Sequence, residues 1–488
     1  MPQPLPTQFI FNEMSAGVVN NIKFNLIPPN SVDRALNMVF DEIYGEAVVR
    51  KGTTLLGAQL HPVDNAITGI HYFSDSAGGA NSRLIAVANS GSNNLIRYYD
   101  GAAWSNSDLT TDTAGLKTRF ETFLDRIVRI NGTDQVLTSA NGINWSSGTV
   151  LDDANFPNGK FLRVYKDQMV VAGKSTKPDS LYVSSVPNAA GTAISWTSGN
   201  REIVINPEDG QNITGLGEVG GNLLVFKDRA MYRWNNRSTE ADTIVEVGSS
   251  SQESIVNCGT GLISFFNPKG VWLTSGEQPI LISRRVQKWI DGMSASYYSN
   301  VASYGDGEHV FTSIGSSTVD GKAYSNVVLR YSTNTKEWTV FSYAHQFRVF
   351  ALYIDSGAEK IVGGDTTNRV LQIESTSLTD NGTAIGFEIQ SHQLDFGSRG
   401  IAKELSERIM AYGLNPTSAL VQVKVYEQGR EGDWITLGAL NKPICNFLIN
   451  QKIKGNYMIF RVAGVSSTTR FRFQGLEAPK ISLLDYTD

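Results

Sequence analysis

The chain has 488 residues, of which 41% are hydrophobic and 18% are charged, and its formal net charge is −5. This composition can bury a full core and excludes a disordered or low-complexity chain. The 46 glycines and the low charged fraction suit many tight turns rather than long helices rich in Lys and Glu. The sequence contains no Lys/Arg run, which excludes attraction of nucleic acid by bulk electrostatics but allows passive contact with DNA.

The cysteines, the N-terminal segment and the apolar runs speak against several further classes of protein. The cysteines, Cys258 and Cys445, lie far apart, so we expect neither a disulfide framework nor a cysteine zinc site. The N-terminal segment lacks a cationic start followed by an apolar run, so we expect no signal peptide. No apolar run reaches the roughly 18 residues that a membrane helix requires, and we expect no membrane insertion.

The first 60 residues form an N-terminal arm that differs from the repeats after it. The stretch NMVFDEIYGEAVVRKG, residues 37–52, is typical of two strands joined near Gly45. The apolar spacing from Val32 to Ile43 would also fit a short helix. We favour strands. We expect the arm to pack on the C-terminal region, because these two segments flank the repeats.

One pattern recurs seven times between residues 61 and 380: a short apolar strand, a polar turn and a second apolar strand. The copies lie at residues 83–104, 125–145, 167–185, 222–234, 261–273, 308–338 and 359–374. Their first apolar residues are 39 to 54 residues apart, close to the period of about 40–50 residues that one four-stranded blade requires. Further strands, such as ITGIHYF, FLRVY and ITGLGEV, precede several copies and are interpreted as inner strands of the blades.

This spacing predicts an all-β fold with a β-propeller of about seven blades, and six or eight blades are also compatible. The alternative is a β-sandwich built from unrelated hairpins. Even spacing over about 300 residues favours the propeller, because stacked blades bury both faces of each sheet and leave only short edges.

The chain changes character after about residue 380. Segments such as GFEIQSHQLDF, SALVQVKVYEQG and YMIFRVAG are longer strands with period-2 alternation. In residues 421–426 the three valines point one way, and Gln422, Lys424 and Tyr426 point the other. This pattern indicates a half-buried antiparallel sheet. We expect residues 381–488 to form a separate β-sandwich or platform together with the N-terminal arm.

Four loose motifs carry a family resemblance. The opening NLIPPNSVDRALNMVFDEIYGEAVVRKGTTLLG places Pro28, Pro29, Asn37, Phe40, Gly45, Arg50 and Gly52. The other motifs are the blade-closing phrases YDGAAW, ANGINW and STNTKEW, the segment GVWLTSGEQPILISRRVQKWID, and the late strand EIQSHQLDFGSRGIAKELSERIMAYG with Asp395, Phe396 and Gly397. With these motifs the chain resembles the tail nozzle or hub proteins of short-tailed bacteriophages, the group of packaged-DNA stabilisation and tail tubular proteins.

The resemblance implies a structural protein of the virion tail, assembled in the host cytoplasm. It implies a homohexameric ring around an axial channel that helps to retain packaged double-stranded DNA and then conducts it during ejection. It also implies a portal, adaptor or head-completion ring above the ring and a tail needle, fibre or tip below it.

Five basic residues are candidate interface or channel contacts. Arg284, Arg285 and Lys288 lie on one short segment beside Trp289, where they could contact DNA or an acidic neighbour. A solvated helix face explains the same three residues, and we favour that interpretation. Arg399 and Lys403 are the further candidates, in the late segment.

No catalytic, cofactor or metal motif stands out. The sequence has no G-x-S-x-G elbow, no P-loop and no HExxH motif. Residues 139–145 are similar to the Asp-box of sialidase propellers, which is a folding turn rather than a catalytic element. Acidic turns such as Asp152–Asp153 would need more oxygen ligands to bind Ca²⁺. We therefore expect no enzyme activity, no cofactor and no metal.

Two other functions remain open. One is a carbohydrate-binding or glycan-cleaving, sialidase-like propeller. It would be a monomer with a deep axial pocket lined by Arg, Tyr and Asp or Glu, although nothing in the sequence marks three arginines as a set. The other is a baseplate or tail-tip module of a long-tailed phage, which would share the platform but bind different partners.

Overall fold

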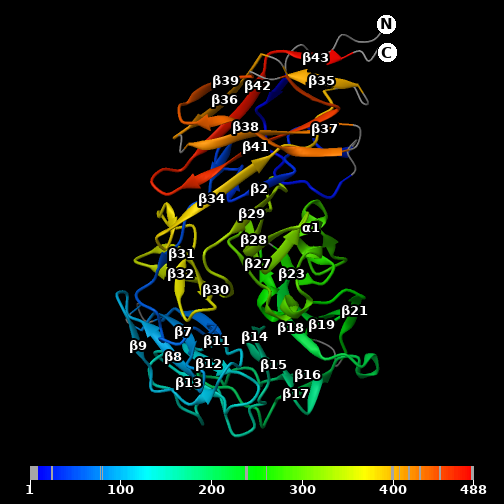
Figure 1. The fold of residues 1–488 in the computed structure, drawn as a ribbon. Coiled ribbons are helices and arrows are strands. Elements are labelled where there is room, and N and C mark those ends of the chain that lie inside the picture. Colours follow the sequence, from blue (N-terminus) through cyan, green and yellow to red (C-terminus); the bar gives the residue numbers. More distant parts are fainter. Residues whose placement is uncertain are drawn as a thin grey trace.

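The computed structural model describes residues 9–22, 26–76, 79, 81–236, 240–259, 261–396, 401–405, 407–415, 418–427, 430–449 and 452–484. Figure 1 shows a wheel of small sheets, seen close to its axis, with a second β domain standing on one side of it. We name these two parts the propeller and the platform. The α-helix α1 (Gln287–Asp291) is short, and no helix in the described part of the chain is long and apolar enough to cross a membrane.

Seven antiparallel units form the propeller. Blade 1 contains β6 (Gly69–Phe73), β7 (Arg83–Asn89), β8 (Asn93–Tyr99), β9 (Trp104–Asn106) and β10 (Asp112–Thr113). Blade 2 contains β11 (Arg119–Phe123), β12 (Arg126–Ile130) and β13 (Leu137–Ser139). Blade 3 contains β14 (Phe161–Tyr165), β15 (Gln168–Lys174), β16 (Lys177–Val183) and β17 (Arg201–Val204). The strands of blades 4 and 5 are β18 (Ile213–Val219), β19 (Asn222–Lys227), β20 (Met231–Trp234) and β21 (Asp242–Val245); and β22 (Val256–Asn257), β23 (Ile263–Asn267), β24 (Gly270–Thr274) and β25 (Ile280–Leu281).

Blades 6 and 7 complete the wheel. Blade 6 contains β26 (Ala302–Gly305), β27 (His309–Val319), β28 (Lys322–Ser332) and β29 (Trp338–Ser342). Blade 7 contains β30 (Phe347–Asp355), β31 (Ala358–Asp365), β32 (Val370–Gln372) and β5 (Thr54–Leu55). The first strand of each blade contacts the first strand of the next, and β30 contacts β6 again. This closed circle confirms the predicted propeller with seven blades. The predicted hairpins coincide with strand pairs such as β7–β8, and FLRVY and ITGLGEV are β14 and β18.

The N-terminal arm closes the wheel. Strand β5 pairs with β32, with Leu55 opposite Leu371 and Thr54 opposite Gln372. Residues 54 and 55 fall within the 60 residues assigned to the arm, yet they supply the outer strand of blade 7. This pairing of an early segment with the last blade joins the two ends of the circle.

Gly52 allows the arm to pass close to the backbone of Thr379, and its replacement should be costly. A Cβ at Gly52 would lie 2.1 Å from the carbonyl oxygen of Thr379. We expect Gly52→Ala to lower the free energy of unfolding by about 1–3 kcal/mol, because β5 must move. Gly386→Ala is the control, since a Cβ there meets nothing within 4 Å, and it should change stability by no more than about 0.5 kcal/mol. Equal denaturant midpoints for the two variants would contradict this role of Gly52.

The platform is a sandwich of two sheets with a small third sheet. The first sheet contains β1 (Phe9–Phe11), β3 (Met38–Val39), β4 (Ala47–Val49), β36 (Arg408–Leu414), β39 (Ile444–Leu448) and β42 (Arg472–Ala478). The second contains β2 (Arg34–Leu36), β33 (Thr379–Asp380), β34 (Thr383–Gln390), β37 (Ala419–Glu427), β38 (Arg430–Leu440) and β41 (Tyr457–Ser466). The third contains β35 (Ala402–Leu405), β40 (Ile453–Gly455) and β43 (Ile481–Leu484). The long C-terminal strands were all predicted by their alternation.

The arm forms strands, as favoured, and the helical alternative is wrong. Strands β3 and β4 pair with each other, and Gly45 lies between them with a φ of 83°, which glycine adopts readily. Strands β1 and β4 pair with β42, and β2 pairs with β34. The arm is therefore built into both sheets of the platform.

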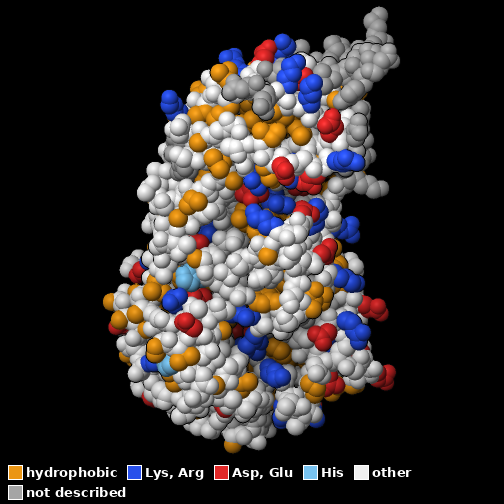
Figure 2. Space-filling model, viewed as in Figure 1, with side chains coloured by type: hydrophobic (Ala, Val, Ile, Leu, Met, Phe, Trp, Pro, Cys, Tyr) orange, Lys and Arg blue, Asp and Glu red, His pale blue; other side chains and the backbone are white. Residues whose placement is uncertain are grey.

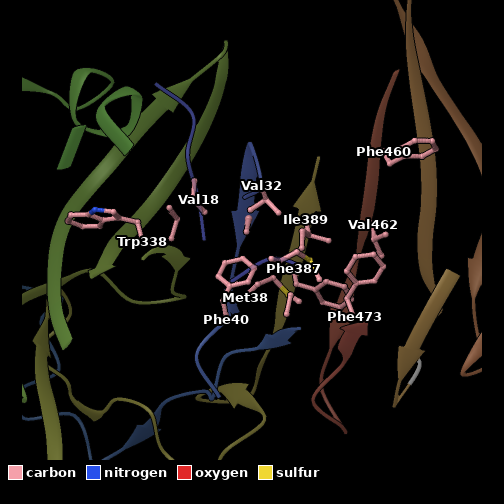
Figure 3. Close-up of a cluster of buried hydrophobic side chains, with 14 of the residues drawn as sticks. Val18, Val32, Met38, Phe40, Trp338, Phe387, Ile389, Phe460, Val462 and Phe473 are labelled. Carbon is pink, nitrogen blue, oxygen red and sulfur yellow. The ribbon is translucent and has the colours of Figure 1, made fainter. Parts of the chain in front are cut away.

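Propeller and platform share one sheet and one core. Strand β2 also pairs in parallel with β29 of blade 6, so blade 6 and the second platform sheet form one ten-stranded sheet. Figure 3 shows Trp338 of blade 6, Val32 and Phe40 of the arm, and Phe387 and Phe473 of the platform in one buried cluster. Each of these side chains is at most 2% exposed. Burial of such large apolar surfaces stabilises the junction.

Candidate functional site

The predicted basic segment lies where the arm meets the propeller. Arg284 and Arg285 belong to the 3₁₀ turn η4 (Ser283–Val286), which leads directly into α1. The carbonyl oxygen of Arg285 accepts a hydrogen bond from the backbone N–H of Asn20 (2.9 Å), and that of Arg284 accepts one from Asn21 Nδ2 (3.3 Å). The backbone of this segment therefore anchors the arm. The Arg284 side chain is exposed and that of Arg285 is half-buried.

Lys288 lines a groove between propeller and platform, which we name the waist groove. The groove has a volume of about 510 Å³ and is lined by Lys288 and Asp320 on one side and by Lys424, Trp434 and Arg461 on the other. Figure 2 shows acidic and basic side chains gathered between the platform and the region of α1. The groove is thus a polar surface of mixed charge.

The charges of the waist groove pair across it. Arg34 lies 3.0 Å from Asp320 and 3.7 Å from Glu388. Lys288 lies 3.1 Å from Asp320, and Lys322 lies 3.0 Å from Glu388. These ion pairs join the β27–β28 turn to strands β2 and β34 of the platform. They link the two parts, and they leave Lys288 with an acidic partner inside the chain.

The predicted alternation of strand β37 is confirmed and forms one wall of this groove. Val421 and Val423 are fully buried, whereas Lys424 and Tyr426 line the groove. The sequence pattern therefore identified the polar face of this strand. It did not identify the partners of these side chains: Lys424 pairs with Glu431 and lies over the ring of Trp434 at 4.9 Å, both on the neighbouring strand β38.

The remaining two predicted contacts differ in placement. Arg399 lies outside the described residues. Lys403 is on β35, with no exposed surface, and its Nζ donates to the carbonyl oxygen of Asn456 at 3.0 Å. Burial lowers the pKa of Lys403. Figure 1 places β35 at the far end of the platform from α1, so Lys403 does not share a site with Lys288.

The axis of the propeller, which we name the hub, contains charged side chains that the sequence did not mark. Two cavities of about 220 and 460 Å³ lie along it, and Arg163 lines both. Glu253, on the 3₁₀ turn η3 (Gln252–Ser254), lies 2.7 Å from Lys117 and 2.6 Å from Arg119. The connection between blades 4 and 5 is thereby tied to blade 2 across the hub.

Glu253 and Glu121 in the hub have opposite pKa shifts. Burial raises the pKa of Glu253, but the charges of Arg119 and Lys117 outweigh it and lower the pKa to about 2. Burial raises the pKa of Glu121 to about 7, because Arg163 is 4.0 Å away and only partly offsets it. One hub carboxylate thus stabilises the fold when ionised, and the other is disfavoured when ionised.

The hub contains the residue types that the glycan-cleaving alternative requires. Arg119 and Arg163 lie there with Glu121 and Glu253, and Tyr304 lines the larger cavity. Arg119, however, also donates to the carbonyl oxygen of Lys160 (2.8 Å) in addition to its contact with Glu253. Arg163 has Glu121 as its acidic neighbour. Each of these two arginines thus has an acidic neighbour within the chain.

The described residues contain no side-chain cluster suited to metal binding, and their cysteines are buried. No group of three or more His, Cys, Asp or Glu side chains in the described ranges could hold a metal ion. Cys258 and Cys445 are both buried free thiols.

The platform carries an open edge, formed by strands β38 and β39, which we name the platform edge. Within the described part of the chain, β38 pairs only with β37 and β39 only with β36, so each strand leaves one side unpaired. Leu448 is 73% exposed, Ile444 56% and Ile435 41%. Figure 2 shows hydrophobic side chains in a band across the platform. Unpaired strand edges with exposed apolar side chains are sites where another chain can add.

The sequence analysis did not single out the platform edge. The sequence of residues 444–448 could have indicated it, because apolar residues occur on both faces of this strand. In the structure Ile444, Asn446 and Leu448 are exposed, while Cys445 and Phe447 are buried. Alternation that places apolar residues on both faces predicts a strand covered on both sides. In the single chain the outer face of β39 is uncovered.

No protein-family model matches the chain, and no curated protein matches it. The structure is similar to YCF48 from Cyanidioschyzon merolae, at 13% identity over 66% of this chain and 98% of that one, with a TM-score of 0.41. It is similar to BBS1N, solved in complex with ARL6DN, at 12% identity over 67% and 97% of the two chains, with a TM-score of 0.41. It is also similar to the extracellular domain of the one-component system BT4673 from B. thetaiotaomicron, at 11% identity over 92% and 62%, with a TM-score of 0.44. Likenesses this distant carry no conclusion about function, and the propeller rests on the circle of blades itself.

Proposed function

We propose that this chain is a structural subunit of a phage-type tail nozzle or hub. Copies would join through their platforms into a ring, which continues a channel that retains and then conducts genomic DNA. The observation that carries the proposal is the platform edge, where two strands with free edges expose Ile435, Ile444 and Leu448. A strand edge of this kind gains both backbone hydrogen bonds and apolar burial when a second copy covers it.

The connection between the propeller and the platform supports a mechanical role for the chain as a rigid wall. A single ten-stranded sheet runs from blade 6 into the platform, and ion pairs such as Arg34–Asp320 cross the waist groove. Relative motion of the two parts would break hydrogen bonds of the sheet together with these ion pairs. A wall that surrounds DNA needs this rigidity, and the propeller would be a fixed docking body for the parts above and below the ring.

The charge of the chain supports passive contact with DNA. The formal net charge is −5, and the ammonium group of Lys288 is paired with Asp320. A channel wall with a net negative charge would not hold the phosphate backbone, so DNA could slide along it. In this proposal Arg284, which is exposed, contacts a neighbouring protein rather than DNA.

The hub favours assembly over glycan cleavage. A glycan-cleaving propeller needs cationic side chains that are free to bind substrate. Here Glu253 accepts from both Lys117 and Arg119, and Glu121 lies beside Arg163. These pairs join blade 2 to blade 3 and to the connection between blades 4 and 5, which is a structural task.

The proposal is tested by the mass of the particles that the chain forms. We expect mass photometry of the purified chain, alone and mixed with a phage tail extract, to show rings of a single stoichiometry in at least the mixed sample. A template ring is included because an assembly subunit can stay monomeric without one. A chain that remains a single copy in both samples would refute the ring.

Substitution of Leu448 should weaken the ring. We expect Leu448→Asp to shift the equilibrium from ring to single chain by about tenfold or more, because a charge would replace an apolar anchor at the joint. Val186→Asp is the matched control, since Val186 is a valine 61% exposed on the propeller. Sedimentation velocity measures both variants. Equal weakening by the two substitutions would place the joint elsewhere.

A further inference from the structure

A cavity of about 450 Å³ lies between blade 7 and blade 1, away from the hub and the platform edge. It is lined by the side chains of Tyr72, Tyr99 and Tyr353 together with Arg83, Asp100 and Asp355. Its volume falls within the roughly 300–1,000 Å³ typical of small-molecule sites. We name it the tyrosine pocket.

The strand register brings the tyrosines together. Tyr72 on β6 lies opposite Leu84 on β7, and Leu84 lies opposite Tyr99 on β8. Residues in such a row share one face of a sheet, and this face of blade 1 meets blade 7. There the ring of Tyr353 on β30 lies 5.7 Å from that of Tyr72 and 6.0 Å from that of Tyr99, both edge-on.

The phenol groups are oriented by packing and not by hydrogen bonds. Tyr99 is 8% exposed and Tyr353 is 6% exposed, so their rings are fixed in the core between the blades. In the part of the chain that the structure describes, the hydroxyls of Tyr72, Tyr99 and Tyr353 make no hydrogen bond. Three fixed hydroxyls that lack protein partners can donate to and accept from a ligand.

The rim of the pocket adds charged groups, each of which has a neighbour within the chain. Asp355 lies 2.5 Å from Lys360, and Asp100 accepts backbone hydrogen bonds from Ala102 and Ala103 at 2.9 and 2.7 Å. Arg83 lies beside the ring of Tyr98, at 5.3 Å. Two carboxylates and one guanidinium therefore line the pocket itself, and this lining disfavours an acidic ligand.

The rim also leaves room for a ligand. A Cβ at Gly101 or Gly357, the glycines of the two turns that border the pocket, would meet nothing within 4 Å. The entrance is therefore open to solvent.

We propose that the tyrosine pocket binds a neutral hexopyranose unit of a glycan. The hydroxyls, carboxylates and guanidinium that line the pocket match the hydroxyl groups of a sugar in both donor and acceptor sense. The two carboxylates of the lining favour a neutral sugar over an acidic one. Binding in this pocket requires neither a ring of subunits nor any chemistry at the hub, so it is tested independently of the proposed function.

The test uses the full chain and four probes: the methyl glycosides of D-glucose, D-galactose, D-mannose and N-acetyl-D-glucosamine. We expect saturation-transfer difference NMR to show transfer to at least one of them. The double variant Tyr72→Phe/Tyr353→Phe keeps both rings and loses both hydroxyls, so the dissociation constant of that probe should rise about tenfold. Asp355→Asn should weaken binding in the same direction.

Tyr182→Phe is the control, because Tyr182 is a half-buried tyrosine on β16 of blade 3, far from the pocket in sequence. It should bind the probe as the native chain does. Absence of transfer to all four probes would overturn the proposal, as would equal affinity of the double variant and the native chain. Thermal melting of each variant establishes that it is folded, so that a loss of binding is attributed to the missing hydroxyls.

Discussion

Replacement of Arg50 by alanine should lower the free energy of unfolding by about 3–5 kcal/mol, the cost of breaking a buried ion pair from one side. Arg50 has no exposed surface. Its guanidinium donates to both carboxylate oxygens of Asp380, at 2.8 and 2.6 Å, to Asn37 Oδ1 at 2.9 Å and to the carbonyl oxygen of Ser342 at 3.1 Å. It also lies 3.8 Å from the centre of the Tyr343 ring.

The effect should be large because one side chain joins three parts of the molecule. Arg50 and Asn37 belong to the arm, Ser342 ends blade 6 and Asp380 begins the platform. Without the guanidinium, the carboxylate of Asp380 stays buried and loses its cationic partner. A buried charge without a partner costs far more than an exposed one.

Chemical denaturation followed by tryptophan fluorescence measures this loss. Lys177→Ala is the control, because Lys177 pairs with Glu202 at the surface, with 55% and 32% of the two side chains exposed, and should cost no more than about 1 kcal/mol. The double variant Arg50→Met/Asp380→Leu removes both charges and should recover much of the stability. If Arg50→Ala costs no more than Lys177→Ala, the junction does not depend on this pair.

Replacement of Glu253 should have the second largest effect, and this effect should depend on pH. Glu253 is the shared partner of Lys117 and Arg119 in the hub. Its pKa in the folded chain is about 2, below the ordinary 4.5. A shift of this size corresponds to about 3 kcal/mol of stability. We expect Glu253→Gln to lower the free energy of unfolding by about that amount at neutral pH.

The sign of the pH dependence follows from the direction of the shift. A carboxylate with a lowered pKa contributes its stability in full above its unfolded value and loses it as the pH falls through the folded value. The difference between the native chain and Glu253→Gln should therefore shrink between pH 4.5 and pH 2. Denaturant titrations at a series of pH values measure it. A difference that stays constant over this range would show that Glu253 acts through its shape rather than its charge.

Glu121 provides a comparison of opposite sign in the same hub. Burial raises its pKa to about 7, so its ionisation opposes folding as the pH rises through that value. Glu121→Gln should therefore stabilise the chain above neutral pH, where Glu253→Gln destabilises it. Two conservative Glu→Gln changes on one axis would then act in opposite directions.

Much of the fold could be predicted from local sequence patterns. The hairpin at residues 83–104 and the strands at 161–165 and 213–219 formed as expected, because alternation of apolar side chains and polar turns decides strand formation within a few residues. The same local rule gave the polar face of β37. Gly45 marked the turn between β3 and β4, because a left-handed backbone there suits glycine.

The candidate sites could not be predicted in the same way. Arg34 and Asp320 are far apart in the sequence, as are Lys117 and Glu253. The residues around each of these side chains do not indicate which distant residue it contacts. Lys403 illustrates the reverse case: its charge suggested a contact surface, but in the structure its amine is buried against the backbone of residue 456. Charge in a sequence indicates chemistry only after burial and partners are known.

The sequence by itself determined that the chain is all-β, that seven similar hairpins follow one another at blade-like spacing, and that longer alternating strands come after them. These are short-range properties, set by period and turn residues. Only the tertiary structure decided that Leu55 of the arm completes blade 7, that β2 joins blade 6 to the platform, and that tyrosines of blades 1 and 7 share a pocket. Such pairings depend on closure of the whole circle, because the free energy of a long-range contact is gained only once every intervening blade has placed the two segments side by side.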